Sequence, residues 1–141
     1  MTLPIKEESI DYKLYKTLNE DVKLKSNNYG KFDIQFENGD YVNVTGNESL
    51  KNAIIIAIMT RYNELTNLYT GFGCRVHELI KDNQNTMTKY KLELYVSEVL
   101  ENMRRIKEVN SINITELDSK YLVEFIVTSI NDEIVKGSVK L

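Results

Sequence analysis

Few residues in this chain could carry covalent chemistry, and the two best candidates lie three positions apart. Cys74 is the only cysteine and His77 the only histidine. On a helix this spacing would place both side chains on one face, where an imidazole can activate a thiol. Because the rest of a catalytic triad is not indicated, a structural role for both residues is favoured. A lone cysteine also predicts neither an internal disulfide nor a metal-ligand cluster, so we expect no cofactor.

Three glutamates, Glu48, Glu64 and Glu78, are candidates for the carboxylate pair of a glycosidase. Such a pair needs two carboxyl groups held about 5 to 9.5 Å apart. Acidic residues are common on helix surfaces, and nothing in the sequence brings two of these to that separation. We therefore expect a protein that is not an enzyme, with a cell-wall hydrolase kept as the alternative.

Aromatic residues gather around a glycine pair near the middle of the chain. Gly71-Phe72-Gly73 lacks the third glycine and the preceding strand of a phosphate-binding loop, so the glycines are expected to allow a tight start to the next helix. Tyr62, Tyr69 and Phe72 belong to this region. Their rings could form the edge of the core or anchor an interface, since aromatic residues are enriched in the centres of protein contacts.

Charge and hydropathy restrict the partners. The chain has 141 residues with 18 basic and 21 acidic side chains, and its net charge of −3 argues against nucleic acid as the main partner. The longest apolar run, residues 53–59, is far shorter than the about 20 residues that span a bilayer, so no membrane partner is expected. The lone cysteine favours folding in a reducing cytoplasm.

The elements that would position these residues begin with a hairpin and a helix. Residues 32–37 alternate apolar and polar side chains, Asn38-Gly39 is a turn signal, and residues 41–45 predict the returning strand. Asn47 can cap the helix that follows, at residues 48–62, whose apolar surface is too wide for one buried stripe. We expect that helix to be buried on several sides or to pack against another chain.

Two more helices are predicted, at residues 74–81 and 86–107. The longer one carries a continuous apolar stripe that comprises Leu92, Val96, Val99, Met103 and Ile106. Its last turn, where cations complement the helix dipole, would contain Arg104, Arg105 and Lys107. This interpretation is favoured over a basic patch that faces an acidic partner.

Three strands are expected after the helices. The first contains Ile112 and Ile114, the second spans residues 121–130 and the third spans residues 134–141. The second strand is apolar on both faces, which predicts a central strand covered on both sides. Alternation along the third strand places Val135, Val139 and Leu141 inward and Lys136, Ser138 and Lys140 outward, with Gly137 as a candidate bulge.

Strands grouped towards the two ends of the chain, rather than alternating with helices, predict an α+β fold. The expected architecture is a small mixed sheet, from the N-terminal hairpin and the C-terminal three-stranded meander, packed with two main helices and one short helix. Residues 1–28 are polar with widely spaced apolar side chains. They are expected to form an N-terminal arm, either a solvated leader or a segment that orders on a partner, and residues 29–141 to form the α+β domain.

Several stretches resemble the small baseplate wedge proteins of contractile tails. This is a family of sheath initiators historically labelled lysozyme-like, and the resemblance is to its branch from phages and tail-like particles of Gram-positive bacteria. The matching stretches are residues 32–40, 44–50, 60–62, 69–73 and 78–80. The resemblance covers about residues 30–141 and rests on order and spacing rather than on one strong motif.

The resemblance implies a structural baseplate component of a phage tail or tail-like particle, arranged with sixfold symmetry around the tail axis and assembled in the bacterial cytoplasm. Its implied partners are sheath subunits, larger baseplate wedge proteins, and the tail tube or hub. A small adaptor domain of similar fold is a further alternative. Many relatives carry an acid-proline element where this chain has Lys81-Asp82-Asn83-Gln84, and serine where Cys74 stands.

Two docking surfaces follow from the expected elements and the resemblance. The last strand is expected to present an open edge that accepts a strand from a sheath subunit. This sheath-docking edge comprises Ile134, Val135, Lys136, Ser138, Val139, Lys140 and Leu141. A second surface, the interface with the wedge bundle, is expected at the aromatic loop and the short helix and comprises Tyr62, Tyr69, Phe72, Arg75, Lys81 and Asp82.

Overall fold

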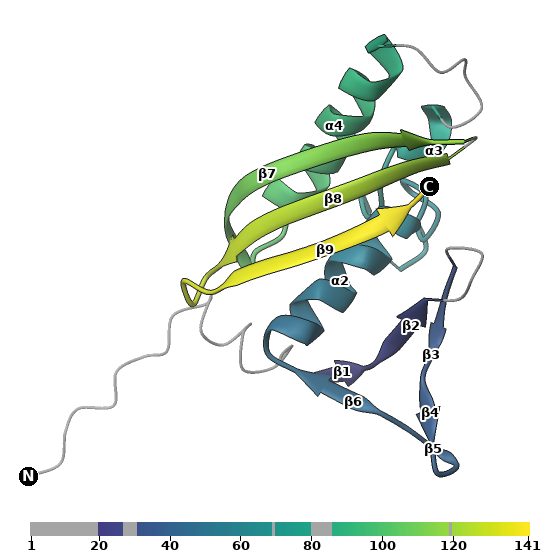
Figure 1. Cartoon of the computed structure of the whole chain (residues 1–141), viewed down its shortest axis with the longest axis vertical. Coiled ribbons are helices and arrows are strands. Elements are labelled where there is room, and N and C mark those ends of the chain that lie inside the picture. Colours follow the sequence, from purple (N-terminus) through teal and green to yellow (C-terminus); the bar gives the residue numbers. More distant parts are fainter. Residues whose placement is uncertain (1–19, 27–30, 69, 80–85, 119) are drawn as a thin grey trace, which may run out of the picture.

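A three-stranded antiparallel sheet with two helices on one face forms the body of the protein. The computed structural model describes residues 20–26, 31–68, 70–79, 86–118 and 120–141. Strands β7 (Ile106–Leu117), β8 (Lys120–Ser129) and β9 (Ile134–Lys140) lie in the order β7-β8-β9. Helices α2 (Asn47–Met59) and α4 (Thr86–Glu101) pack against the same side of this sheet (Figure 1). The predicted α+β class and C-terminal meander are confirmed.

The core lies between this sheet and the two helices. Each helix contributes residues at intervals of four, so that one stripe faces the sheet. Complete burial of each such side chain contributes about 1.5–3 kcal/mol relative to leaving it in water. The buried set comprises Leu50, Ile54 and Ile58 of α2, Leu92, Val96 and Leu100 of α4, and Val123, Phe125, Val127, Val135 and Val139 of the sheet.

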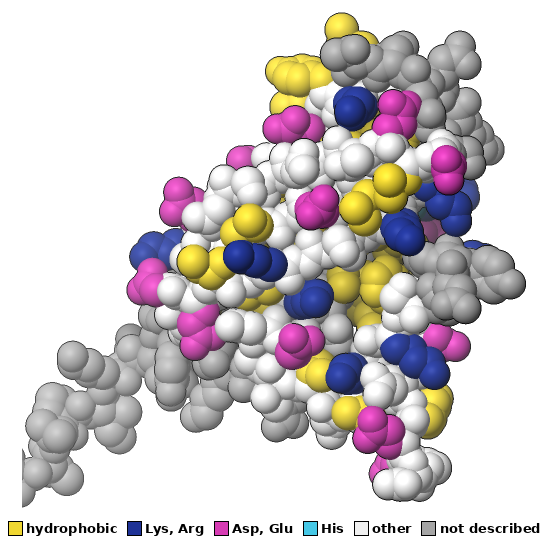
Figure 2. Space-filling model, in the orientation of Figure 1, with side chains coloured by type: hydrophobic (Ala, Val, Ile, Leu, Met, Phe, Trp, Pro, Cys, Tyr) yellow, Lys and Arg dark blue, Asp and Glu magenta, His cyan; other side chains and the backbone are white. Residues whose placement is uncertain are grey.

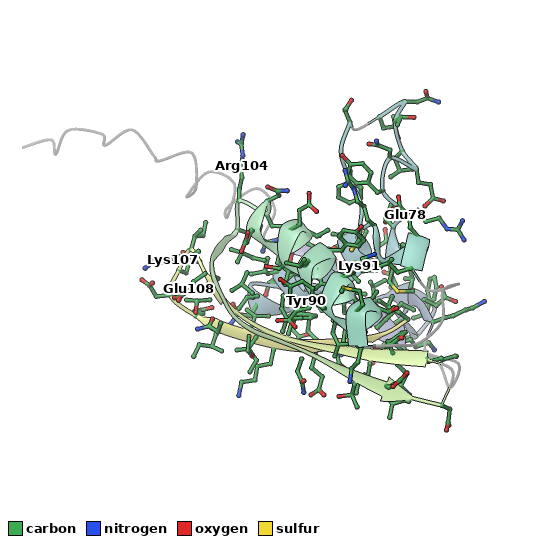
Figure 3. All side chains as sticks on the ribbon, turned by 90° about the horizontal axis from the view of Figure 1, so that it is seen from above. Glu78, Tyr90, Lys91, Arg104, Lys107 and Glu108 are labelled. Atoms are coloured by element: carbon green, nitrogen blue, oxygen red, sulfur yellow. The ribbon has the colours of Figure 1, made fainter. Side chains whose placement is uncertain are left out.

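Strand β8 is central, as predicted, but only one of its faces is covered by a described element. Val123, Phe125 and Val127 are buried under the helices, whereas Leu122 and Ile126 on the other face are half-buried. Figure 3 shows α4 on one side of the sheet and side chains projecting from the other side. The expectation of cover on both sides is therefore wrong for the described part of the isolated chain, and the apolar outer face needs another explanation.

The N-terminal half contains three two-stranded sheets that meet in a triangle (Figure 1). Each sheet forms one corner of the triangle (Figure 1), and three backbone hydrogen bonds join its sides between the strands: Lys23 N donates to Val42 O, Val42 N to Gln35 O, and Gln35 N to Lys23 O, over 2.7, 3.1 and 2.9 Å. The sheets comprise β1 (Glu20–Val22) with β6 (Asn43–Thr45), β2 (Leu24–Ser26) with β3 (Phe32–Ile34), and β4 (Phe36–Glu37) with β5 (Asp40–Tyr41).

The predicted hairpin is therefore present only at its tip. Asn38 and Gly39 have φ angles of 52° and 80°, as its turn requires, and β4 pairs with β5. Away from this turn the two expected strands separate, because residues 20–26 lie between them and pair with both. These residues were expected to belong to the arm 1–28. The rest of the arm lies outside the described residues, and the division of the chain at residue 28 stays a prediction.

The helix limits differ from those expected. Gly46, with φ 62°, precedes the first helical residue of α2, and Asn47 is already inside the helix, so the predicted cap by Asn47 is wrong. The helix ends at Met59 because Thr60 adopts an extended conformation. The short helix α3 (Val76–Leu79) begins two residues after Cys74, and α4 ends at Glu101 instead of residue 107.

Gly137 does not form the bulge that its position suggested. The register between β8 and β9 is continuous through Gly137, and the register shifts lie in β7, between Ile106 and Glu108 and between Val109 and Ser111. A Cβ added at Gly137 would overlap the Phe125 ring. The glycine is therefore explained by the close approach of a core aromatic side chain to the backbone of β9.

The Gly137→Ala substitution should lower the free energy of unfolding by about 1–3 kcal/mol, because the added methyl group forces the Phe125 ring out of its packed position. Urea denaturation of the single and double variants would measure this. In a Phe125→Leu background the cost of the alanine should fall, since the clashing ring atoms are gone. Ser138→Ala, on the exposed face of the same strand, is the control. An equal cost in both backgrounds would contradict the assignment.

Candidate functional site

A groove of about 1110 Å³ lies between α2 and α4 and is called the helix groove below. Its floor consists of Ser49, Ala53 and Ala57, small side chains four residues apart on α2. The opposite wall consists of Tyr95, Glu98 and Val99 of α4 and of Asn102, which directly follows that helix. Small residues let another backbone approach closely. The groove therefore has room for a third helix that packs against both α2 and α4.

The two helices run in opposite directions along this groove. Arg105, four residues after the end of α4, donates from Nη1 to Oγ of Ser49 at the start of α2 over 3.4 Å. Near the other end of α2, Cys74 Sγ lies 3.7 Å from the carbonyl oxygen of Tyr95 in the middle of α4. The groove is therefore closed at one end by residues 103–105 and at the other by the loop that follows α2.

That loop is held in shape by backbone hydrogen bonds. Cys74 N donates to Thr60 O over 2.8 Å, and Tyr62 N donates to Cys74 O over 3.2 Å, which gives a short bridge between the two arms of the loop. A Cβ at Gly73, whose φ is 110°, would overlap the carbonyl of Arg61. The glycine is thus required by the close approach of the two backbones, and it fixes where Phe72 lies.

Three of the residues predicted for the wedge-bundle interface come together at this end of the helix groove. Tyr62, Phe72 and Arg75 all line it, and the guanidinium carbon of Arg75 lies 4.5 Å from the centroid of the Tyr62 ring. A cation over a ring at this distance is attracted by the π electrons and is held in place. The other three residues of that prediction, Tyr69, Lys81 and Asp82, lie outside the described residues.

The basic cluster at residues 104–107 does not belong to a helix, so the favoured explanation by the helix dipole is wrong. Arg105 is buried and also donates from Nη2 to Gly46 O over 3.4 Å. Lys107, in β7, forms an exposed ion pair with Asp132 of the β8–β9 turn. Arg104 is exposed, lines the end of the helix groove and projects away from the sheet (Figure 3).

The second candidate surface is the edge of β9 that faces away from β8, hereafter the open edge. Leu141 and Tyr121 exchange two hydrogen bonds, of 2.8 and 3.0 Å, so odd-numbered residues of β9 direct their backbone groups towards β8. In an antiparallel ladder the alternate residues then direct theirs outward. These are Ile134, Lys136, Ser138 and Lys140, and no strand among the described residues pairs with them.

The predicted facing of the side chains on β9 is confirmed. Val135 and Val139 are 4% and 1% exposed, and Leu141 is half-buried against the core. Lys136, Ser138 and Lys140 are exposed on the outer face, together with Ile134. Next to the carboxyl half of β9 lies a smaller groove of about 330 Å³, hereafter the edge groove, whose other walls are Leu24, Phe32 and Ile55 together with polar residues of α2.

Cys74 and His77 occupy structural positions. The Cys74 thiol is completely buried, and burial raises its pKa to about 11, so that it stays protonated near neutral pH. His77 Nε2 lies 3.0 Å from the carbonyl oxygen of Ile58, and this contact joins α3 to the last turn of α2. Among the described residues no hydrogen bond joins the thiol to the imidazole, and this arrangement favours the structural interpretation of both.

Two of the candidate carboxylates lie at opposite ends of α2, and the third, Glu78, is exposed on α3. Glu48 is in the first turn of α2, whereas Glu64 follows its end and accepts a hydrogen bond from Arg61 N over 3.1 Å. From Glu48 to its end at Met59, α2 rises about 17 Å at 1.5 Å per residue, beyond the spacing of a glycosidase pair. In the described ranges no cluster of three His, Cys, Asp or Glu residues could hold a metal ion. No helix in the same ranges is long and apolar enough to cross a membrane.

Sequence reasoning missed the α4 wall and the buried arginine. Tyr95, Glu98 and Asn102 recur at intervals of three and four, which is the signal of one helix face, but they were not considered together. The role of Arg105 depends on its contact with Ser49, a residue 56 positions away. Such a contact leaves no pattern in one sequence.

Comparison with known proteins identifies a family and, separately, a solved structure of similar fold. A family model described as contractile injection system sheath initiator matches residues 21–132. A crystal structure of a Geobacter sulfurreducens protein, provisionally described as a tail lysozyme, superimposes with a TM-score of 0.59 at 21% identity, covering 67% of this chain and 87% of that chain. At this identity the likeness supports the fold alone. A comparison with curated protein sequences found no significant match.

Proposed function

The chain belongs to the contractile injection system sheath initiator family, and from this premise we propose that it starts sheath assembly by offering the open edge of β9 to a strand of a sheath subunit. It is a structural component of a contractile tail baseplate. The observation that carries the proposal is the row of outward backbone groups on Ile134, Lys136, Ser138 and Lys140, which have no partner strand among the described residues.

Strand addition would satisfy these groups directly. A donated strand at residues 134–140 extends the sheet from three strands to four, and main-chain hydrogen bonds then supply affinity while side chains supply specificity. The sheet is well suited to accept it, since β9 is fixed by the buried Val135 and Val139. A rigid acceptor loses little conformational entropy on binding, which favours the first docking event.

We further propose that the helix groove receives a helix from the larger baseplate wedge proteins. Its small floor residues, its volume of about 1110 Å³ and its aromatic end suit an amphipathic helix laid along α2 and α4. Tyr62 and Phe72 would serve as anchors, with Arg75 held over the Tyr62 ring to meet an acidic group. This proposal places Tyr62, Phe72 and Arg75 in the role that the sequence suggested for them.

The same proposal includes sixfold copies around the tail axis, contact with the tail tube or hub, and assembly in the bacterial cytoplasm. It also assigns no catalytic step to this chain. Because of the likeness to a protein provisionally described as a tail lysozyme, a cell-wall hydrolase remains the alternative function. The buried Cys74 and the separation of Glu48 from Glu64 argue against that alternative.

Particles assembled without this chain should carry tubes that have no sheath, because the first ring of sheath subunits has nothing to pair with. Electron microscopy of particles from a deletion strain, before and after addition of the purified chain, would measure the sheathed fraction. Purified chain should also release no fragments from cell walls in a muralytic assay. Normal sheaths in the deletion strain, or measurable turnover that is lost in Glu48→Gln or Glu64→Gln variants, would reject the proposal.

A further inference from the structure

We propose, on the premise that β9 accepts a sheath strand, that the donated strand is two-sided, with acidic side chains opposite Lys136 and Lys140 and an apolar side chain that enters the edge groove. Membership of the sheath initiator family does not specify which side chains the donated strand carries. The outer face of β9 and the edge groove specify it: the first carries Lys136 and Lys140, and the second combines apolar side chains with a larger share of polar lining that includes Lys140 itself.

The outer face of β9 is basic where it meets the open edge. Lys136 and Lys140 are exposed, four residues apart, and neither has an ion-pair partner among the described residues. Their neighbours on β8 are the apolar Ile126 and Leu122, and the acidic Glu124 lies beside Ser138 between them. Figure 2 shows Lys and Arg side chains interspersed with apolar and acidic ones on this face of the molecule.

A fourth strand would place its own side chains directly beside these lysines. Side chains of directly opposed residues on adjacent strands lie about 4.5–5.5 Å apart, and opposite charges at such positions are favourable whereas like charges are unfavourable. The spacing of Lys136 and Lys140 therefore calls for two acidic residues four apart on the incoming strand. Charge pairs of this kind set register and exclude wrong partners more than they add affinity.

The inward face of the incoming strand would contact the edge groove instead of the outer face with its lysines. The edge groove is lined by the half-buried Leu24 and Phe32, by Gly137 and by the buried Ile55, and its polar lining includes Ser138 and Lys140 of β9. Because side chains alternate along a strand, residues next to the acidic positions point into this groove. An apolar side chain there would cover Phe32, and the polar rim of Glu48 and Lys51 would remain in water.

The charge half of the proposal is tested with tube–baseplate particles that carry the full-length chain and with purified sheath subunits as the probe. Lys136→Glu with Lys140→Glu should reduce the sheathed fraction at least about tenfold, since two attractions become repulsions. Lys89→Glu with Lys91→Glu, which makes the same charge change on α4, should leave sheathing at the wild-type level. Sheath subunits whose acidic strand positions are changed to lysine should restore sheathing on the reversed baseplate.

The apolar half is tested in the same assay by Leu24→Asp, which places a carboxylate in the edge groove. It should impair sheathing, whereas Lys25→Asp on the opposite side of the same strand should not. Wild-type sheathing with both the lysine reversals and Leu24→Asp would overturn the inference about the strand. If sheathing also survives Ser138→Pro, which obstructs the backbone edge itself, then the proposed function fails as well, so that the two failures are distinguishable.

Discussion

Tube–baseplate particles that carry the Ser138→Pro variant should be unable to acquire a sheath, although the variant chain remains folded. Ser138 directs its backbone N–H towards the open edge, so proline removes no hydrogen bond between β8 and β9. It does remove a donor that an incoming strand needs, and its ring obstructs the approach of that strand. The free energy of unfolding should stay within about 1 kcal/mol of wild type.

The measurement is the sheathed fraction by electron microscopy, together with urea denaturation of each purified chain. Ser138→Ala keeps the N–H and should form normal sheaths. Val139→Pro is the opposite control, because its N–H bonds to β8 and its side chain is buried, so this variant should lose stability. Normal sheathing with Ser138→Pro would show that strands are not added at β9.

Deletion of residues 134–141 is a poorer test of the same idea. Val135 and Val139 on this strand are part of the buried core, so the deletion removes packing as well as an edge. Replacement of such core residues typically costs several kcal/mol, and the loss of sheath would then report unfolding. A change confined to the outward backbone groups separates docking from stability.

The Ala53→Trp variant should fail to join the baseplate wedge while its own fold is kept. Ala53 is half-buried on the floor of the helix groove, and a large ring there fills the space that a partner helix would occupy. Since the ring covers apolar surface, it should not lower the free energy of unfolding. Incorporation into wedge complexes should fall to below about a tenth of the wild-type level, as expected when a clash replaces a close contact.

Co-purification of the chain with the larger wedge proteins measures this effect. Ala53→Ser keeps the groove open and should be incorporated normally. A melting temperature at or above that of wild type would confirm that Ala53→Trp is folded. Full incorporation of the folded tryptophan variant would exclude the helix groove as the wedge surface and would leave the edge proposal untouched.

The sequence alone determined the C-terminal sheet and the first half of the buried stripe of α4. Alternation along residues 134–140 assigned each side chain of β9 to the correct face, because the period of a strand is two regardless of its surroundings. The predicted stripe of α4 is correct at Leu92 and Val96, but its next member, Val99, lines the helix groove, and the third fully buried position is Leu100. Local periodicity carries this information, since burial on one face of an element requires a regular recurrence of apolar residues.

Where elements end was decided by tertiary contacts. The pattern of α4 continued to residue 107, but the chain leaves the helix at Glu101, and Arg105 turns to bond Ser49 and Gly46 across the fold. The two strands of the N-terminal hairpin separate beyond Gln35 and Val42, because residues 20–26 lie between them and Lys23 bonds to both. A hydrogen bond between distant segments can outweigh local propensity, and it gives no signal in the residues on either side of it.

The two candidate surfaces differ in the same way. The open edge of β9 could be predicted, because strand order in a meander leaves its last strand at the rim. The helix groove could not, because it arises only when Ser49, Ala53 and Ala57 come to face Tyr95 and Glu98 across two antiparallel helices. A single sequence specifies which face of each helix is small or polar, but the packing of the whole chain decides which two faces meet and what space is left between them.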